Sequence, residues 1–233
     1  MNRVLKAGLS AIGLAIFISA ISVTIASAQG PLTDVLRRMD ANNKALQSLT
    51  ADIMMLKFNS QLNIPDPTYI GTVSYLPKGK SHGAYIRIDW NKPVEEKVSV
   101  MGDKYELWRV RLNQIVSGNV DKASKGASAG NVMSFFSMSR DQMRANYDVI
   151  YIGDETLSSG TPTFHIQMTP KAKVSYKMAD LWVDQNGMPQ QAKILESNND
   201  TTTVQLTNIK KNVTIKASIF KLDPPKNVSR IKN

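Results

Sequence analysis

The strongest signal for catalysis is the motif G-A-S-A-G at residues 126–130, which matches the G-x-S-x-G pattern around the nucleophile of serine hydrolases. Asp154 and His165 follow in the hydrolase order of serine, acid and histidine. In such an enzyme Ser128 would directly follow a buried strand, yet residues 121–125 are the polar sequence D-K-A-S-K. Small residues in loops often match this motif by chance. We therefore rank hydrolysis last among the functional hypotheses, and turnover of an ester substrate would support it.

No other set of side chains has the spacing of a catalytic or metal site. The only histidines, His82 and His165, are far apart in sequence, and the chain has no cysteine to supply thiolate chemistry, disulfides or metal ligands. The acidic pairs at 95–96 and 154–155 are adjacent residues, which point to opposite faces of a strand. We therefore predict no catalytic residues, no metal site and no cofactor.

The first 28 residues have the three parts of a secretory signal peptide. Arg3 and Lys6 precede an apolar stretch at 9–25, and A-S-A at 26–28 is a typical cleavage site. The alternative is an uncleaved anchor, but a membrane-spanning helix needs about 20 apolar residues, and polar residues follow the stretch. We expect cleavage after Ala28, which leaves one domain at 29–233.

The charge of the chain is strongly basic. The formal net charge is +10, and it becomes +8 (10 − 2) when Arg3 and Lys6 leave with the signal. Nucleic acid is an unsuitable partner for an exported protein, so the excess of cations favours anionic membrane surfaces or acidic protein faces, or serves solubility. Part of this excess is a basic C-terminal segment formed by Lys210, Lys211, Lys216, Lys221, Lys226 and Arg230.

The spacing of apolar residues predicts mostly β-strands. Helical spacing occurs at 32–57, where the part from Asp52 onward would equally suit a strand, and at 131–146 after a small, polar loop at 118–130. The sequence D-Q-N-G at 184–187 predicts a hairpin turn. Many short strands separated by turns indicate an antiparallel sheet or barrel. The predicted strands are 69–75, 84–90, 98–100, 105–110, 112–116, 149–152, 163–168, 177–183, 191–196, 202–209 and 213–215.

Two apolar stripes stand out against this pattern. One runs along a predicted strand at Ile86, Ile88 and Trp90, and the other lies on the predicted helix with Met133, Phe135 and Phe136. Their ordinary interpretation is a hydrophobic core. A helix lying over an open sheet would equally act as a lid above a cavity, and periodicity does not separate the two.

In their order along the chain, these pieces resemble the LolA family of periplasmic outer-membrane lipoprotein carriers. The resemblance covers nearly all of 29–233. It rests on the helix at 32–49, G-T-V-S-Y-L at 71–76, I-R-I-D-W-N-K-P at 86–93, G-D-K to L-W at 102–108, and the Met- and Phe-rich helix. The second half fits best, with T-P-K at 169–171, L-W-V-D at 181–184 before Gly187, and Phe220 before P-P-K-N-V at 224–228.

The resemblance implies a mainly β, α+β fold: an incomplete antiparallel β-barrel, or half-barrel, with a helical lid over an apolar cavity. It implies a periplasmic, monomeric carrier without catalytic activity. Such a carrier takes acylated lipoprotein or lipid cargo from an inner-membrane donor complex and transfers it to an outer-membrane acceptor. The alternative within the same fold is a lipid-sensing or interaction module that regulates a membrane partner without shuttling cargo. The residues that would line the cavity are Ile86, Ile88, Trp90, Trp108, Met133, Phe135 and Phe136.

One position departs from the family pattern. Lipoprotein carriers of this family have an Arg-Pro pair ahead of the aromatic strand, and the arginine holds the lid closed through backbone carbonyls. Here the pair aligns with His82 and Gly83. His82 is therefore the candidate for a weaker latch, because a neutral imidazole donates only one hydrogen bond. Lys80 and Arg87 are alternatives.

Overall fold

Over the residues that the structure describes, the fold is a single large sheet accompanied by the α-helices α1 (Gln29–Ala45) and α4 (Arg140–Asn146). The computed structural model describes residues 29–79, 82–120 and 135–232. The predicted signal peptide, Met133 and the motif at 126–130 lie outside these ranges. The helices and strands are α1 (Gln29–Ala45), β1 (Leu49–Asn59), β2 (Ile64–Pro65), β3 (Tyr69–Leu76), β4 (Tyr85–Lys92), β5 (Glu96–Met101), β6 (Lys104–Arg109), η1 (Val110–Leu112), β7 (Gln114–Asn119), α4 (Arg140–Asn146), β8 (Tyr147–Thr156), β9 (Pro162–Pro170), β10 (Tyr176–Asp184), β11 (Pro189–Glu196), β12 (Thr201–Lys211), η2 (Ala217–Phe220) and β13 (Ser229–Lys232).

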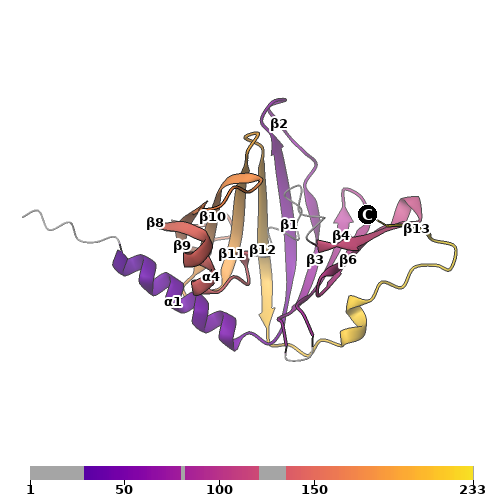
Figure 1. Ribbon diagram of the computed structural model, residues 1–233, viewed down its shortest axis with the longest axis horizontal. Helices are drawn as coiled ribbons and strands as arrows, with labels where there is room; N and C mark the ends of the chain where they lie inside the picture. Colours follow the sequence, from indigo (N-terminus) through magenta and orange to yellow (C-terminus); the bar gives the residue numbers. More distant parts are fainter. Residues whose placement is uncertain (1–28, 80–81, 121–134, 233) are drawn as a thin grey trace, which may run out of the picture.

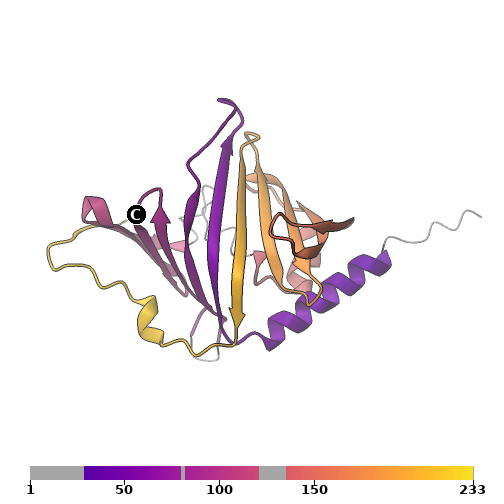
Figure 2. The same ribbon diagram turned by 180° about the vertical axis from the view of Figure 1, so that it is seen from behind.

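The sheet consists of two meanders joined at one pair of strands. Its order is β13-β7-β6-β5-β4-β3-β1-β12-β11-β10-β9-β8, with β2 paired to β1. All neighbours are antiparallel except β13, which runs parallel to β7. The two end strands, β13 and β8, do not pair with each other, so the curved sheet stays open (Figures 1 and 2). The predicted fold class, an incomplete antiparallel barrel with helices, is confirmed.

Alternation along each strand gives the sheet two different faces. In β1 the buried residues are Leu49, Ala51, Ile53 and Met55, and the residues between them face the other way. We call the face of Ile53 the inner face and the opposite one the outer face. Because directly paired residues share a face, the strand register identifies the inner-face residues of both meanders. Ile53 pairs with Leu206 of β12, and the inner-face residue Val73 of β3 pairs with Ile88 of β4.

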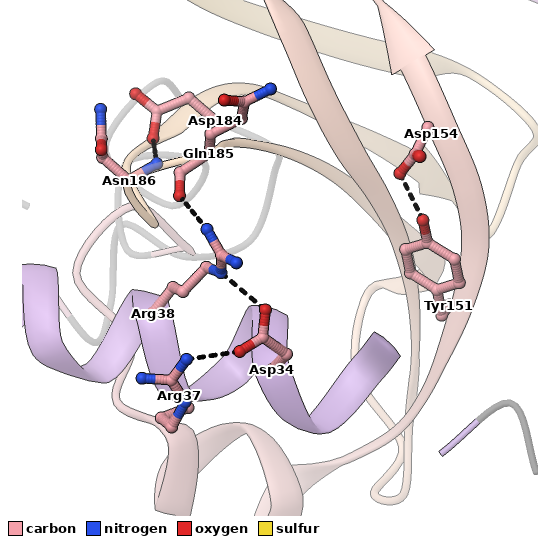
Figure 3. A network of polar contacts seen from close by, with 8 residues as sticks. All are labelled: Asp34, Arg37, Arg38, Tyr151, Asp154, Asp184, Gln185 and Asn186. Carbon is pink, nitrogen blue, oxygen red and sulfur yellow. Dashed lines mark hydrogen bonds and ion pairs between the residues drawn. The ribbon is translucent and has the colours of Figure 1, made fainter. Parts of the chain in front are cut away.

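Helix α1 lies against the turn of the β10–β11 hairpin. Arg38 donates one hydrogen bond to Asp34 (Nε to Oδ2, 2.7 Å) and another to the backbone oxygen of Gln185 (Nη1, 2.7 Å), as Figure 3 shows. The predicted turn at 184–187 is confirmed, with the Gly187 N–H donating to the Asp184 carbonyl. The apolar side of the helix, with Val35, Leu36 and Met39 buried, packs into the cluster on the inner face together with Leu46, which follows the helix.

The predicted helix at 32–57 ends at Ala45, and the strand left as the alternative from Asp52 onward is confirmed. Leu46, Leu49, Ile53 and Leu56 have helical spacing, but β1 begins at Leu49 and alternates with period two. Strand pairing on both sides, with β12 and β3, satisfies the backbone of this segment and overrides the local pattern. Leu56 consequently lies on the outer face.

Two further predicted elements differ from those in the structure. The helix expected at 131–146 is interrupted, because α4 begins only at Arg140, where Ser139 and Gln142 form a reciprocal capping box. Residues 213–215 do not form a strand and instead lead into η2. Across the described ranges, no helix has both the length and the apolar character needed to cross a bilayer.

Candidate functional site

The inner face carries one continuous apolar cluster. Both meanders contribute to it, and α1 and α4 cover it. Its central members have little or no solvent exposure, and several are methionines, whose flexible thioethers adapt to irregular surroundings. Among these residues are Ile53, Met55, Val73, Ile88, Trp90, Met143, Ile166, Met168, Leu181, Met188, Val204 and Leu206.

Phe135 and Phe136 fill the space above this face. Phe135 is 2% exposed, and its ring centroid lies 6.0 Å from those of both Tyr147 and Tyr176. The hydroxyls of these two tyrosines are 2.6 Å apart, and burial together with this bond raises the pKa of Tyr176. Phe136 is 4% exposed and lines a cavity of about 10 Å³, beside Leu46, Leu49, Tyr75, Ser137, Met188 and Leu206. The chain's own aromatic side chains therefore occupy the inner face.

Polar contacts hold the segment that carries these phenylalanines. We call residues 135–139 the lid segment. Asn43 of α1 donates a hydrogen bond to the Met138 carbonyl (Nδ2 to O, 2.9 Å). The Tyr75 hydroxyl bonds to the Ser137 side chain, which partly offsets the rise that burial causes in the pKa of Tyr75. The lid segment is thus tied to α1 and to β3, in different parts of the fold.

The apolar face continues beyond the lid segment. Ile86 and Val98 are half-buried and pack against the cluster. Val98 pairs with Leu107, and Leu107 with Val116, so strands β5, β6 and β7 extend the inner face toward the sheet edge. These side chains are less covered than those near α1. Among the described residues, this half of the inner face is therefore the less covered one.

Five of the predicted lining residues meet in this cluster, and one does not. Ile86, Ile88, Trp90, Phe135 and Phe136 come together on the inner face, although their binding role stays a prediction. Trp108 lies on the outer face, because its neighbour Leu107 points inward and successive strand residues alternate. There the Lys97 ammonium sits 5.3 Å from its ring centroid.

The two described latch candidates, His82 and Arg87, contact residues other than those of the lid segment. His82 packs on Tyr85 (ring centroids 4.9 Å apart), and its Nδ1 is 2.7 Å from the Gly83 carbonyl oxygen. Tyr85 in turn packs on Phe220 of η2, which covers the outer face. Arg87 also points outward and pairs with Asp89 (Nε to Oδ1, 2.6 Å). Lys80 is outside the described ranges. Tyr75 and Asn43 hold the lid segment instead.

Ser128 lies outside the described residues, and the other two residues of the hydrolase hypothesis, Asp154 and His165, pair with different partners. Asp154 accepts a hydrogen bond from the Tyr151 hydroxyl (Figure 3). Burial, and to a lesser degree this bond, raise the pKa of Tyr151 to about 12. His165 instead lies between Glu155 (Nδ1 to Oε2, 3.2 Å) and Asp180 (Nε2 to Oδ1, 3.0 Å) on the outer face. Within the ranges that the structure describes, no group of His, Asp and Glu is suited to hold a metal ion.

Sequence reasoning missed the residues that surround the two phenylalanines. Tyr147 and Tyr176 are 29 positions apart, and nothing in their local patterns links them. The sequence patterns place Tyr75 on a strand and Asn43 on a helix, but neither of them in a site. The alternation of β3 does place Tyr75 on the same face as Val73, and this is the one available signal.

Comparisons with known proteins agree with this geometry. The profile of a family described as outer membrane lipoprotein carrier protein LolA matches residues 81–223, which is more than half of the chain. No curated protein matches the sequence. Among solved structures, an uncharacterized conserved protein from Thermus thermophilus has a TM-score of 0.55 at 12% identity, over 87% of this chain and 99% of that chain.

Two further structures are similar at comparable identity. MucB gives a TM-score of 0.50 at 14% identity, over 85% of this chain and 64% of that chain. Lipoprotein LppX from Mycobacterium tuberculosis gives a TM-score of 0.43 at 15% identity, over 80% of this chain and 100% of that chain. At these identities the likenesses concern the fold alone.

Proposed function

Because the chain belongs to the LolA family of outer membrane lipoprotein carrier proteins, we propose that it carries the acyl chains of lipoproteins, or a related lipid, on its inner face. The observation that carries this proposal is the burial of Phe135 and Phe136 against an apolar face that extends beyond them. Each methylene group removed from water contributes about 0.8 kcal/mol, so acyl chains can replace phenylalanine side chains without loss of apolar contact.

The cargo enters, in this proposal, when the lid segment leaves the inner face. Among the described contacts, those of Asn43 and Tyr75 tie this segment to α1 and β3 and must then be broken, while the sheet itself stays intact. Methionines such as Met143 and Met188 repack around chains of different shape. The protein acts by binding and release alone, without catalysis.

The route of the cargo follows from the same premise. We propose that the protein works as a monomer in the periplasm, receives cargo from an inner-membrane donor complex and delivers it to an outer-membrane acceptor. Native mass spectrometry of the protein purified from its own periplasm, followed by lipid extraction, tests this. We expect a co-purifying acylated protein or one lipid species in stoichiometric amount. An empty protein in a stable complex with a membrane protein would favour the regulatory module instead.

Two adjacent residues of β6 allow a matched test of the binding face. Leu107 points to the inner face and Trp108 to the outer face. We expect Leu107→Asp to weaken binding of a fluorescent fatty acid by at least about tenfold, because a carboxylate would have to be buried against the acyl chain. Trp108→Asp should leave the dissociation constant unchanged. Equal effects of the two substitutions, in variants with native circular dichroism, would argue against the inner face as the binding site.

A further inference from the structure

A second apolar surface lies outside the inner face, at one end of the molecule. Strands β1, β2 and β3 and their connections leave five large apolar side chains exposed, and we call this group the apex patch: Met54, Leu56, Leu62, Ile64 and Ile70. Leu62 is 67% exposed and Ile64 is 51% exposed. Soluble proteins seldom leave several such side chains together unless the surface meets another apolar phase.

The apex patch joins three outer-face residues, Met54, Leu56 and Ile70, to the tip of the β1–β2 hairpin, where Ile64 shares the face of its partner Asn59. Met54 of β1 pairs directly with Ile70 of β3, and Leu56 follows Met54 two positions later on the same face. Strand β2 then folds back on the end of β1, with Ile64 opposite Asn59, and Leu62 lies in the turn between them. Figures 1 and 2 show β2 at the extremity of the molecule, far from α1.

The turn that presents Leu62 is fixed by the neighbouring hairpin. The Ser60 backbone N–H donates to Asp200 (N to Oδ1, 2.8 Å), and the Ser60 hydroxyl donates to the Asn198 carbonyl (3.0 Å). The bond from the Ser60 backbone holds the pKa of Asp200 below its usual range, so the carboxylate is ionised at neutral pH. The apolar side chains are therefore held outward, rather than free to fold back onto the sheet.

Lysines flank the apex patch on both sides. Lys92 of β4 is paired with Ile70. On the other side, Leu56 pairs with Thr203, which pairs with Lys193 of β11. Lys177 donates to Asn199 (Nζ to Oδ1, 2.6 Å) in the turn beside Ser60. Of the nearby carboxylates, Asp200 is engaged by Ser60, and Asp66 is exposed on the connection after β2. Asp52, two positions before Met54 on the same face, is exposed and accepts a hydrogen bond from Asn208 (Nδ2 to Oδ2, 2.6 Å). Apolar side chains with lysines at their border are the composition of surfaces that bind anionic lipid.

We propose that the apex patch docks the protein on the surface of an anionic phospholipid bilayer. Leu62 and Ile64 enter the boundary between headgroups and acyl chains, and Lys92 and Lys193 contact lipid phosphates. A protein partner fits less well, because a stable interface buries about 800 Å² on each side, and a narrow projecting turn offers little flat surface. The formal net charge of residues 29–233, +8 (10 − 2), adds long-range attraction to the same surface. This docking does not require a ligand on the inner face.

Flotation of the full protein with phospholipid vesicles tests the proposal. We expect binding to vesicles that contain phosphatidylglycerol and weaker binding to pure phosphatidylcholine. Leu62→Asp should reduce binding by at least about tenfold, because a charge replaces an inserted apolar side chain. Leu112→Asp is the matched control, since Leu112 is also 67% exposed but lies in η1, and it should bind as the unmodified protein does.

Three results would overturn the proposal: no binding to protein-free vesicles, equal losses for the two variants, or binding only to native membranes that retain their proteins. The last would identify the apex patch as a protein interface. Affinity for a fluorescent fatty acid should stay unchanged in Leu62→Asp. That second measurement separates the two proposals, because a protein that docks on vesicles yet binds no fatty acid would contradict only the carrier function.

Discussion

Gly187 determines how closely helix α1 approaches the sheet. Its φ is +82°, in the region where only glycine is free of strain. A Cβ atom at this position would also lie 2.3 Å from the backbone carbon and oxygen of Arg38 in α1. The residue therefore serves the turn and the helix packing together.

Replacing Gly187 by alanine should cost more stability than the same change at Gly160. Gly160 has a φ of +81° with no atom near the added Cβ, so Gly160→Ala should lose roughly 1 kcal/mol from backbone strain alone. Gly187→Ala adds the displacement of α1, an overpacking cost of about 1–3 kcal/mol. Urea unfolding measures both. Equal losses would show that α1 moves away at no cost.

The site residues that periodicity could predict are those on a single strand. The alternation of Ile86, Ile88 and Trp90 predicts one shared face for all three, and they meet there in the structure. Only the family resemblance places Trp108 on the same face, although its own strand register sends it outward. The face of a side chain follows from local alternation, whereas the pairing of Tyr147 with Tyr176 depends on how distant strands align.

At the scale of elements, the lid segment is tied to α1 and β3 by described polar contacts of Asn43 and Tyr75. Asn43→Ala and Tyr75→Phe each remove one hydrogen bond to it, worth about 1 kcal/mol. We expect either change to favour the open state about fivefold and to speed the entry of a fluorescent fatty acid accordingly. Stopped-flow fluorescence measures the rate.

Tyr151→Phe is the control for this prediction. It also removes a tyrosine hydroxyl with a hydrogen bond, but the partner is Asp154 rather than the lid segment. Its entry rate should match that of the unmodified protein. If all three variants gave the same rate, the hydrogen bonds of Asn43 and Tyr75 would not govern opening.

The elements themselves could be predicted only unevenly. Strands with clear alternation and bounded turns are predicted close to their true limits, as at β4 and β10. The boundary between α1 and β1 is missed because Leu46, Leu49 and Ile53 suit both periods over so short a stretch. Only the pairing of β1 with β3 and with the distant β12 resolves that ambiguity, and single-sequence patterns contain no such information.

The whole molecule has one apolar cluster that spans both meanders. Trp90 lies in the first meander and the buried Leu181 in the second, and they belong to the same cluster. We therefore expect one cooperative unfolding transition. Variants that retain only Trp90 or only Trp182 should give the same urea midpoint by fluorescence, and far-UV circular dichroism should coincide with both. Separate midpoints would mean that the two meanders unfold independently.

The order of the strands also has a consequence for how the chain reaches this structure. Each meander pairs strands that are close in sequence, but β1 and β12, joined at the centre of the sheet, stand at opposite ends of the chain. Pairs that are distant in sequence form slowly, because a long loop must close first. We expect the two meanders to form early and the central pair to be the rate-limiting step of folding. Until β12 arrives, β1 exposes a long unpaired edge, so an interval of vulnerability to aggregation follows directly from the topology.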